Sequence, residues 1–211
     1  MAKIGAVFFD IGGVLLTNGW DQAERARVLA HFSVDRAEYE LRHEAANDAW
    51  ERGLIPVEEF LDRTIFFEPR SFTAADFLER MKAESKELAP GLGALGVLRR
   101  LRASACLKLA ALNNEAKELN EYRIERFQLG SGFSAFFSSC YLGLRKPEPE
   151  IFLVALDVFQ QPPETTVFID DRQANCDAAE CVGMHGICFQ NEAQLVAELK
   201  RLGVELPPTG A

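Results

Sequence analysis

The sequence predicts an α/β fold in which a doubly wound parallel sheet of the Rossmann-like type carries an inserted all-helical segment. After about residue 90, short runs rich in Val, Ile and Phe alternate with amphipathic helical patterns, which is typical of parallel βαβ units. Between about residues 18 and 86, apolar residues instead recur every three to four positions, and no strand pattern interrupts them. We therefore expect a core domain at 1–16 and 88–205, a helical domain at 17–87 and a flexible tail at 206–211.

Each element follows from its residue pattern. The first strand is "KIGAVFF" at 3–9, an apolar run with the length of a buried strand. Within the helical segment, Pro56 suits the first turn of a helix and Thr73 suits an N-cap. The expected helices are 20–32, 38–50, 56–67 and 73–84 in the insert, then 91–103, a polar helix from about 115, one from about 147, 174–183 and 192–203. The further expected strands are 106–112, 135–140, 166–169 and 185–189.

The composition excludes several classes of protein. A formal net charge of −9 over 211 residues argues against a nucleic-acid-binding surface, which needs clustered Lys and Arg. No apolar stretch approaches the ~20 residues that span a bilayer, so we expect no membrane partner. The cysteines are odd in number and show no metal-binding spacing, so we expect free thiols and a cytoplasmic protein. They are Cys106, Cys140, Cys176, Cys181 and Cys188.

Unusual polar residues follow three of the predicted strands. Asp10 ends the first strand, Asn113 and Asn114 follow the second, and Asp170 and Asp171 follow "TVFI". In an open α/β sheet the ligand site lies beyond the carboxyl ends of the strands. We therefore expect these side chains to meet at one edge of the sheet.

The chemistry of this group points to phosphate. Carboxylates close together repel one another, so they need a divalent cation, and hard oxygen ligands favour Mg²⁺. Lys146, in the loop after the strand at 135–140, offers a positive charge for a carboxylate and a bound anion. The Asn113 and Asn114 amides and the backbone N–H groups of Gly12 and Gly13 offer donors to phosphate oxygens. A carboxylate nucleophile beside Mg²⁺ is equipped to form and hydrolyse an aspartyl-phosphate.

Four motifs resemble those of the haloacid dehalogenase-like hydrolase superfamily. They are "VFFDIGGVLL", "LAALNNE", "GLRKPEPEIF" and "TVFIDDRQANCDAAECVGMHGI", which span the core, and the helical insert is similar to the cap of that superfamily. The pair "DIGGVL" and "WERGLIPVEEF" is similar to a bacterial branch described as sugar-phosphate phosphatases. That branch is related to the N-terminal phosphatase domain of soluble epoxide hydrolases.

The resemblance implies a role for each residue of the acidic group. Asp10 is implied to be the nucleophile and a metal ligand, and Gly12 to offer its carbonyl oxygen to Mg²⁺. Asp171 is implied to bind the metal directly, and Asp170 to act through water or as a supporting partner. Lys146 is implied to steady Asp10 and the phosphoryl group.

Two residues depart from the pattern of the superfamily. Gly12 stands where a second Asp commonly acts as general acid, a group that contributes typically ~10²–10⁴-fold to the rate. Asn113 stands where Ser or Thr usually binds a phosphate oxygen, although Asn114 fits the amide that often follows. Candidate replacements for the acid lie in the insert, where each is also explained as a solvated helix residue. They are His43, Glu44, Asp48 and Glu51, with Arg52 as a partner for a substrate anion.

We therefore expect a Mg²⁺-dependent phosphatase that hydrolyses a small phosphorylated metabolite, such as a sugar phosphate, through an aspartyl-phosphate at Asp10. The first alternative is a weakly active or non-catalytic phosphate-binding module, because Gly12 and Asn113 are both off-pattern. The second is a 2-haloacid dehalogenase, which also uses an Asp nucleophile but no metal; the Asp170-Asp171 pair disfavours it. Substrate identity and oligomeric state stay open.

Overall fold

The protein contains one five-stranded parallel sheet in the order β3-β2-β1-β4-β5. The computed structural model describes residues 3–104 and 106–207. The strands are β1 (Ala6–Phe9), β2 (Lys108–Asn113), β3 (Ala135–Ser138), β4 (Thr166–Asp170) and β5 (His185–Cys188). Because the first strand lies in the centre and the order reverses beside it, the sheet is doubly wound. The predicted α/β fold class is confirmed.

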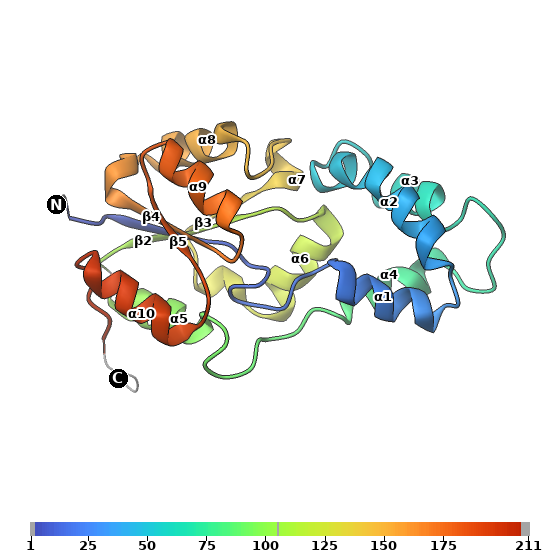
Figure 1. Ribbon diagram of the computed structural model, residues 1–211, viewed down its shortest axis with the longest axis horizontal. Helices are drawn as coiled ribbons and strands as arrows, with labels where there is room; N and C mark the ends of the chain where they lie inside the picture. The colour runs from blue at the N-terminus through green and yellow to red at the C-terminus, as the bar shows by residue number, and fades with distance from the viewer. Residues whose placement is uncertain (1–2, 105, 208–211) are drawn as a thin grey trace.

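Helices cover both faces of this sheet. Figure 1 shows α8 and α9 on one face and α5 and α10 on the other. Their bounds are α5 (Leu95–Ser104), α6 (Lys117–Arg126), α7 (Ser139–Leu142), α8 (Pro149–Phe159), α9 (Gln173–Cys181) and α10 (Glu192–Arg201). Alternate residues of β1 serve the two cores: Val7 and Phe9 join the α5–α10 side, while Ala6 and Phe8 join the α8–α9 side. Every residue of this strand is buried, which explains its continuous apolar run.

The inserted helices form a separate group beyond the sheet (Figure 1). They are α1 (Gln22–His31), α2 (Arg36–Glu51), α3 (Val57–Thr64) and α4 (Ala74–Lys82). Their apolar faces share one cluster, in which the Trp50 and Phe60 rings stack with centroids 3.9 Å apart. Thr73 caps α4 in a reciprocal capping box with Asp76, as predicted, whereas Pro56 occupies the N-cap of α3 and not its first turn.

The chain enters and leaves the helical group side by side. Leu16 bridges to Glu87, and the Thr17 N–H donates to the Lys86 carbonyl at 2.8 Å. Two adjacent segments of the chain therefore connect the sheet to the inserted helices. We place the proposed boundaries of the helical domain, 17–87, at this connection.

The structure differs from the sequence prediction mainly at strand ends. The strand predicted to reach residue 140 stops at Ser138, because the next four residues form α7, which the sequence did not predict. Conversely, β2 includes Asn113 and β4 includes Asp170, because each pairs in register with a residue of the neighbouring strand. The predicted tail at 206–211 is held at its start, where the Pro207 carbonyl accepts from Arg100 Nε at 2.7 Å. Residues 208–211 lie outside the described residues.

Two expectations from composition can be compared with the structure. Among the described residues, no helix is long and apolar enough to cross a membrane. All five cysteines lie in the described ranges as free thiols, with Cys140 and Cys176 buried.

Candidate active site

Three carboxylates meet at the carboxyl ends of β1 and β4. Asp10 follows β1, Asp170 is the last residue of β4, and Asp171 comes directly after it. One oxygen from each carboxylate lies within 4.8 Å of the other two. The two strands are neighbours in the sheet, so their shared register brings residues far apart in sequence to one point. The structure thus brings together the acidic residues that the sequence singled out.

Lys146 provides the positive charge at this cluster. Its Nζ atom lies 3.1 Å from Asp10 Oδ1 and 2.6 Å from Asp170 Oδ2, and its side chain is 1% exposed. The side chain of Asn114 fixes its backbone: Asn114 Nδ2 donates to the Lys146 carbonyl at 2.8 Å, and Asn114 Oδ1 accepts from the Lys146 N–H at 2.9 Å. Asn114 therefore positions the lysine; it also lines the cavity above the cluster, so its predicted contact with phosphate stays a prediction.

Asp170 is held as a carboxylate. It accepts from the Arg172 N–H at 2.8 Å and from Asn175 Nδ2 at 2.9 and 3.0 Å. Burial opposes ionisation of Asp170, but Lys146 and these hydrogen bonds outweigh it and hold the pKa of the carboxyl below its usual value. Both carboxylate oxygens of Asp170 therefore already accept hydrogen bonds from the protein. This arrangement suits a residue that supports the metal ligands and does not bind substrate.

Asp10 and Asp171 differ from Asp170 in the direction of their pKa shifts. Burial raises the pKa of Asp10 to about 7, with Asp170 and Asp171 adding to the rise and Lys146 offsetting part of it. Burial and the charge of Asp170 also raise the pKa of Asp171. Asp171 Oδ1 is buried and has no hydrogen-bond partner in residues 3–104 and 106–207. Three hard-oxygen donors with one lysine between them, and one orphaned carboxylate oxygen, fit a divalent cation such as Mg²⁺.

The glycine turn after Asp10 shapes this cluster. Gly13 has a φ of 69°, and its N–H donates to the Leu16 carbonyl at 2.8 Å, so this amide is not available to a phosphate oxygen. A Cβ atom on Gly13 would lie 2.3 Å from Asp171 Oδ2. Glycine is therefore required here both by the left-handed backbone and by the close approach of the Asp171 carboxylate.

Gly13→Ala is expected to weaken Mg²⁺ binding by at least ~10-fold, because the added methyl group must displace the Asp171 carboxylate. The measurement is the Mg²⁺-dependent rise in melting temperature, titrated with the metal. Gly91→Ala is the matched control, since Gly91 has a φ of 79° but no atom within 4 Å of its Cβ position. Equal Mg²⁺ affinity in the two variants would show that Asp171 is not a metal ligand.

Asn113 does not reach the site. Its Nδ2 donates to Asn120 Oδ1 at 3.0 Å, its Oδ1 accepts from Ser138 Oγ at 2.8 Å, and the residue is 2% exposed. Both ends of the amide are thus satisfied inside the core. We assign its side chain to the packing of β2 against β3 and α6, and not to the predicted contact with a phosphate oxygen.

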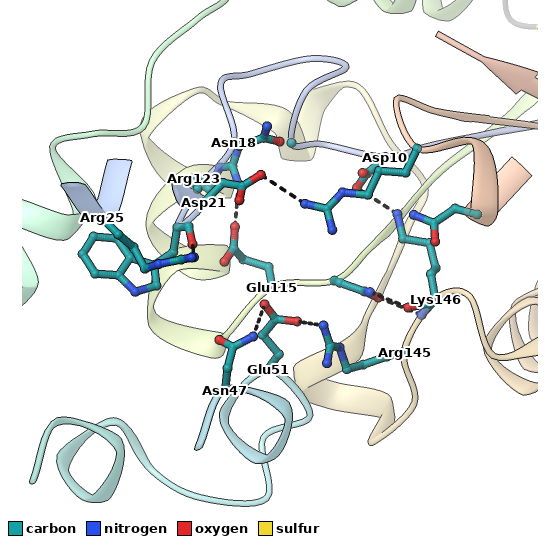
Figure 2. Close-up of a pocket in the computed structure, with 16 residues that line it drawn as sticks. Asp10, Asn18, Asp21, Arg25, Asn47, Glu51, Glu115, Arg123, Arg145 and Lys146 are labelled. Carbon is teal, nitrogen blue, oxygen red and sulfur yellow. Dashed lines mark hydrogen bonds and ion pairs between the residues drawn. The ribbon is translucent and has the colours of Figure 1, made fainter. Parts of the chain in front are cut away.

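A cavity of about 160 Å³ opens above the acidic cluster, between the sheet and the inserted helices. Figure 2 shows Asp10 and Lys146 on one side of it and residues of α1 and α2 on the other. Five cationic side chains and four carboxylates line it, a composition suited to a small, highly polar ligand. The cationic residues are Arg25, Arg123, Arg145, Lys146 and Arg172; the acidic ones are Asp10, Asp21, Glu51 and Glu115.

Of the candidate residues in the insert, Glu51 lines this cavity. Its Oε2 pairs with Arg145 Nη2 at 2.6 Å, next to Lys146 in the chain. Asp48 pairs with Arg145 and Arg52, each at 2.9 Å, and Arg52 also pairs with Glu148. These pairs connect α2 to the loop that carries Lys146.

His43 and Glu44 line a neighbouring pocket of about 460 Å³. Arg25, Asn47 and Arg145 border both spaces. Burial lowers the pKa of His43 to about 4, so the imidazole is neutral near pH 7. A neutral imidazole that does not line the cavity above the acidic cluster is poorly suited to replace the missing acid.

Several residues of the site were not predicted from the sequence. Asn175 lies in the first turn of α9, five residues after Asp170, and this spacing could have identified it. Arg123 and Glu115 form a buried ion pair with Nη1 and Oε2 2.5 Å apart. Nothing in the polar pattern of α6 distinguishes Arg123 from its solvated neighbours, so the sequence offered no signal for this pair.

The family model of haloacid dehalogenase-like hydrolases matches residues 4–183. This range contains Asp10, Lys146, Asp170 and Asp171, whose side chains meet beneath the cavity. The chain belongs to this family of hydrolases, as its sequence motifs predicted.

The chain is also similar to individual proteins and to solved structures. It is 31% identical to flavin mononucleotide hydrolase 1 of Arabidopsis thaliana, over 97% of this chain and 80% of that protein. It is 26% identical to the sesquiterpene phosphatase astK of Aspergillus oryzae, over 93% and 95% of the two chains. A predicted hydrolase of this family from Porphyromonas gingivalis superposes with a TM-score of 0.76 and 25% identity, covering 97% of this chain and all of that one.

Proposed function

We propose that the protein is a Mg²⁺-dependent phosphatase that hydrolyses a small phosphorylated metabolite through an aspartyl-phosphate at Asp10. The observation that carries the proposal is the meeting of three carboxylates and one buried lysine beneath a small cavity rich in arginine. Two relatives that align with most of this chain are named as a flavin mononucleotide hydrolase and a sesquiterpene phosphatase. The second name is that of a phosphatase, and the first names hydrolysis of a compound that contains a phosphate ester, which supports the same reaction class here.

Asp10 is assigned as the nucleophile. Of the three carboxylates it alone follows the central strand and lines the cavity, whereas Asp170 is fully buried and saturated with hydrogen bonds. Lys146 holds Asp10 in place through its ion pair and offers a positive charge to the phosphoryl oxygens. In the reaction, an Asp10 oxygen bonds to phosphorus as the ester oxygen leaves, and water then cleaves the aspartyl-phosphate.

The residues that would hold Mg²⁺ are Asp10, Asp171 and the carbonyl of Gly12, with Asp170 in support. When bound, the ion would neutralise the carboxylates and polarise a phosphoryl oxygen. The donor set consists of oxygens, which is the preference of this cation. The orphaned Asp171 Oδ1 supports the assignment of Asp171 as a ligand.

The test is a screen of phosphorylated metabolites with and without Mg²⁺, including sugar phosphates and flavin mononucleotide. We expect phosphate release that EDTA abolishes and Mg²⁺ restores. A parallel arm with 2-haloacids measures halide release. Halide release that persists in EDTA, with no phosphate release from any ester, would reverse the proposal in favour of a dehalogenase.

Gly12 favours a second candidate, a phosphate-binding module with little or no turnover. Its position lines the cavity without a side chain that could donate a proton. Such a module would be stabilised by Mg²⁺ together with a phosphate mimic, and would release no phosphate in the same screen. Phosphate release therefore distinguishes the two candidate functions, whereas ligand binding does not.

Mg²⁺ is expected to stabilise the protein more at pH 8 than at pH 6. The pKa of Asp10 is raised to about 7 in the metal-free protein, so below that pH the cation must displace a proton, while above it the carboxylate is already charged. Melting temperatures between pH 5.5 and 8.5, in EDTA and in Mg²⁺, measure this. A Mg²⁺-induced shift that is constant across this range would argue against Asp10 as a ligand.

A further inference from the structure

The space beside Gly12 is occupied. Its backbone φ lies outside the left-handed region, so the turn itself does not require glycine at this position. A Cβ atom on Gly12 would lie 3.1 Å from Asn18 Oδ1 and 3.8 Å from Arg123 Nη1. The volume into which an acidic side chain would extend from position 12 is therefore bordered by an amide and a guanidinium group.

Arg123 is held in a single position by the surrounding chain. Its Nη1 donates to Glu115 Oε2 at 2.5 Å, its Nη2 donates to the Thr17 carbonyl at 2.5 Å, and the residue is 2% exposed. Its buried Nε has no acceptor among the described residues. A guanidinium at the wall of the cavity, fixed by two partners, presents a preorganised positive charge to a bound ligand.

Glu115 completes this arrangement from the end of β2. Its backbone N–H donates to Ser139 Oγ at 3.0 Å, and its side chain approaches Gly19 so closely that a Cβ atom there would lie 2.3 Å from Oε2. Removing both charges of an ion pair from water is costly, so a buried pair is weak evidence for stability. A pair placed at a catalytic cavity is better explained by what it does there.

We propose that Arg123 stabilises the negative charge on the leaving oxygen in place of the absent general acid, and that Glu115 is its positioning residue. This inference rests on the proposed phosphatase function. The guanidinium of Arg123 offers fixed N–H donors and a positive charge, so it lowers the barrier by its charge and not by proton transfer. Figure 2 shows the pair at the wall of the cavity that also contains Asp10 and Lys146.

The reaction balances without an acid from the protein. As Asp10 bonds to phosphorus, the bond from phosphorus to the ester oxygen breaks and its electron pair stays on that oxygen, beside Arg123. Water protonates the departed oxygen, and the resulting hydroxide attacks phosphorus to release phosphate and free Asp10. The sum is ester and water giving alcohol and phosphate.

This mechanism predicts the chemical class of the preferred substrates. Without proton donation, charge develops fully on the leaving oxygen, so the rate falls as the pKa of the leaving hydroxyl rises. We therefore expect preference for phosphoesters whose leaving oxygen is acidic, such as aryl, enol or anomeric phosphates, over simple alkyl phosphates.

The experiment compares kcat/KM for nitrophenyl, phenyl and alkyl phosphates at saturating Mg²⁺. For Arg123→Met we expect a loss of about 10-fold with nitrophenyl phosphate and ~10²–10³-fold with the phenyl and alkyl esters. Arg25→Met is the matched control, since Arg25 also lines the cavity and binds one carboxylate and one backbone carbonyl. It should lose activity by the same factor for every ester.

Glu115→Gln tests the positioning role and covers the case in which Arg123→Met does not fold. We expect a smaller loss, again greater for poor leaving groups, with an unchanged pH profile. Equal losses across the esters in both variants would overturn the role of Arg123. Removal of the alkaline limb from the pH profile by Glu115→Gln would also overturn it, because that limb reports loss of the proton of a general acid, and Glu115 would then be the acid. No turnover of any ester by the wild-type protein would instead contradict the proposed function itself.

Discussion

Asp10→Asn is expected to abolish phosphate release, by at least ~10⁴-fold, while the protein stays folded. An amide cannot attack phosphorus, and no other described carboxylate of the acidic cluster can take over: Asp170 is fully buried, and Asp171 does not line the cavity. The measurement is phosphate release in Mg²⁺ from the best substrate of the screen. Asp157→Asn, an exposed aspartate on α8, is the control and should keep full activity.

The same variant should be more stable than the wild-type protein when metal is absent. The folded-state pKa of Asp10 is about 7, well above the usual value of an aspartate, so its charged form is disfavoured by folding. The free energy of unfolding of the wild-type protein therefore falls as the pH rises from about 4 to about 7. Above that pH the loss is complete and amounts to a few kcal/mol. Melting temperatures in EDTA at pH 5 and pH 8 measure it. A lower melting temperature for Asp10→Asn at pH 8 would contradict the described electrostatics.

Lys146→Met is expected to lower activity by ~10²–10⁴-fold and to destabilise the metal-free protein by about 3–5 kcal/mol. Lys146 is the cation in contact with both Asp10 and Asp170, so its removal leaves these two carboxylates without their ion-pair partner. Because the cation site then carries more negative charge, Mg²⁺ should recover part of the lost stability but not the lost activity.

Chemical denaturation in EDTA and in Mg²⁺ measures the loss of stability in Lys146→Met, and steady-state kinetics measures its loss of activity. Lys108→Met is the control, since that lysine donates to the Phe159 carbonyl at the surface and contacts no carboxylate among the described residues. If Lys146→Met were as stable as the control, the ion pairs at the cluster would not be contributing as described.

The sequence predicted the fold and the acidic cluster because both depend on short-range patterns. Alternating strand and helix signals imply parallel strands, and polar residues at strand ends then meet at one edge of the sheet. Asp10, Lys146, Asp170 and Asp171 were identified this way, and the structure brings them together.

The remainder of the site depends on side-chain direction, which the patterns do not contain. Asn113 lies at the predicted edge of the sheet, as the last residue of β2, but its amide turns into the core to bind Asn120 and Ser138. Arg123 reaches the cavity from the last turn of a polar helix, where its contacts with Glu115 and the Thr17 carbonyl distinguish it from its neighbours. Residues contributed by α1 and α2 likewise depend on how the inserted helices pack over the sheet.

The most direct test of the proposed mechanism is a rapid acid quench during turnover of a phosphate-labelled ester, followed by peptide mapping of the protein. We expect label on the peptide that contains Asp10; this label should be absent in Asp10→Asn and should be removed by a chase with excess unlabelled substrate. Phosphate release within the first turnover with no labelled protein, or label on a different residue, would contradict it.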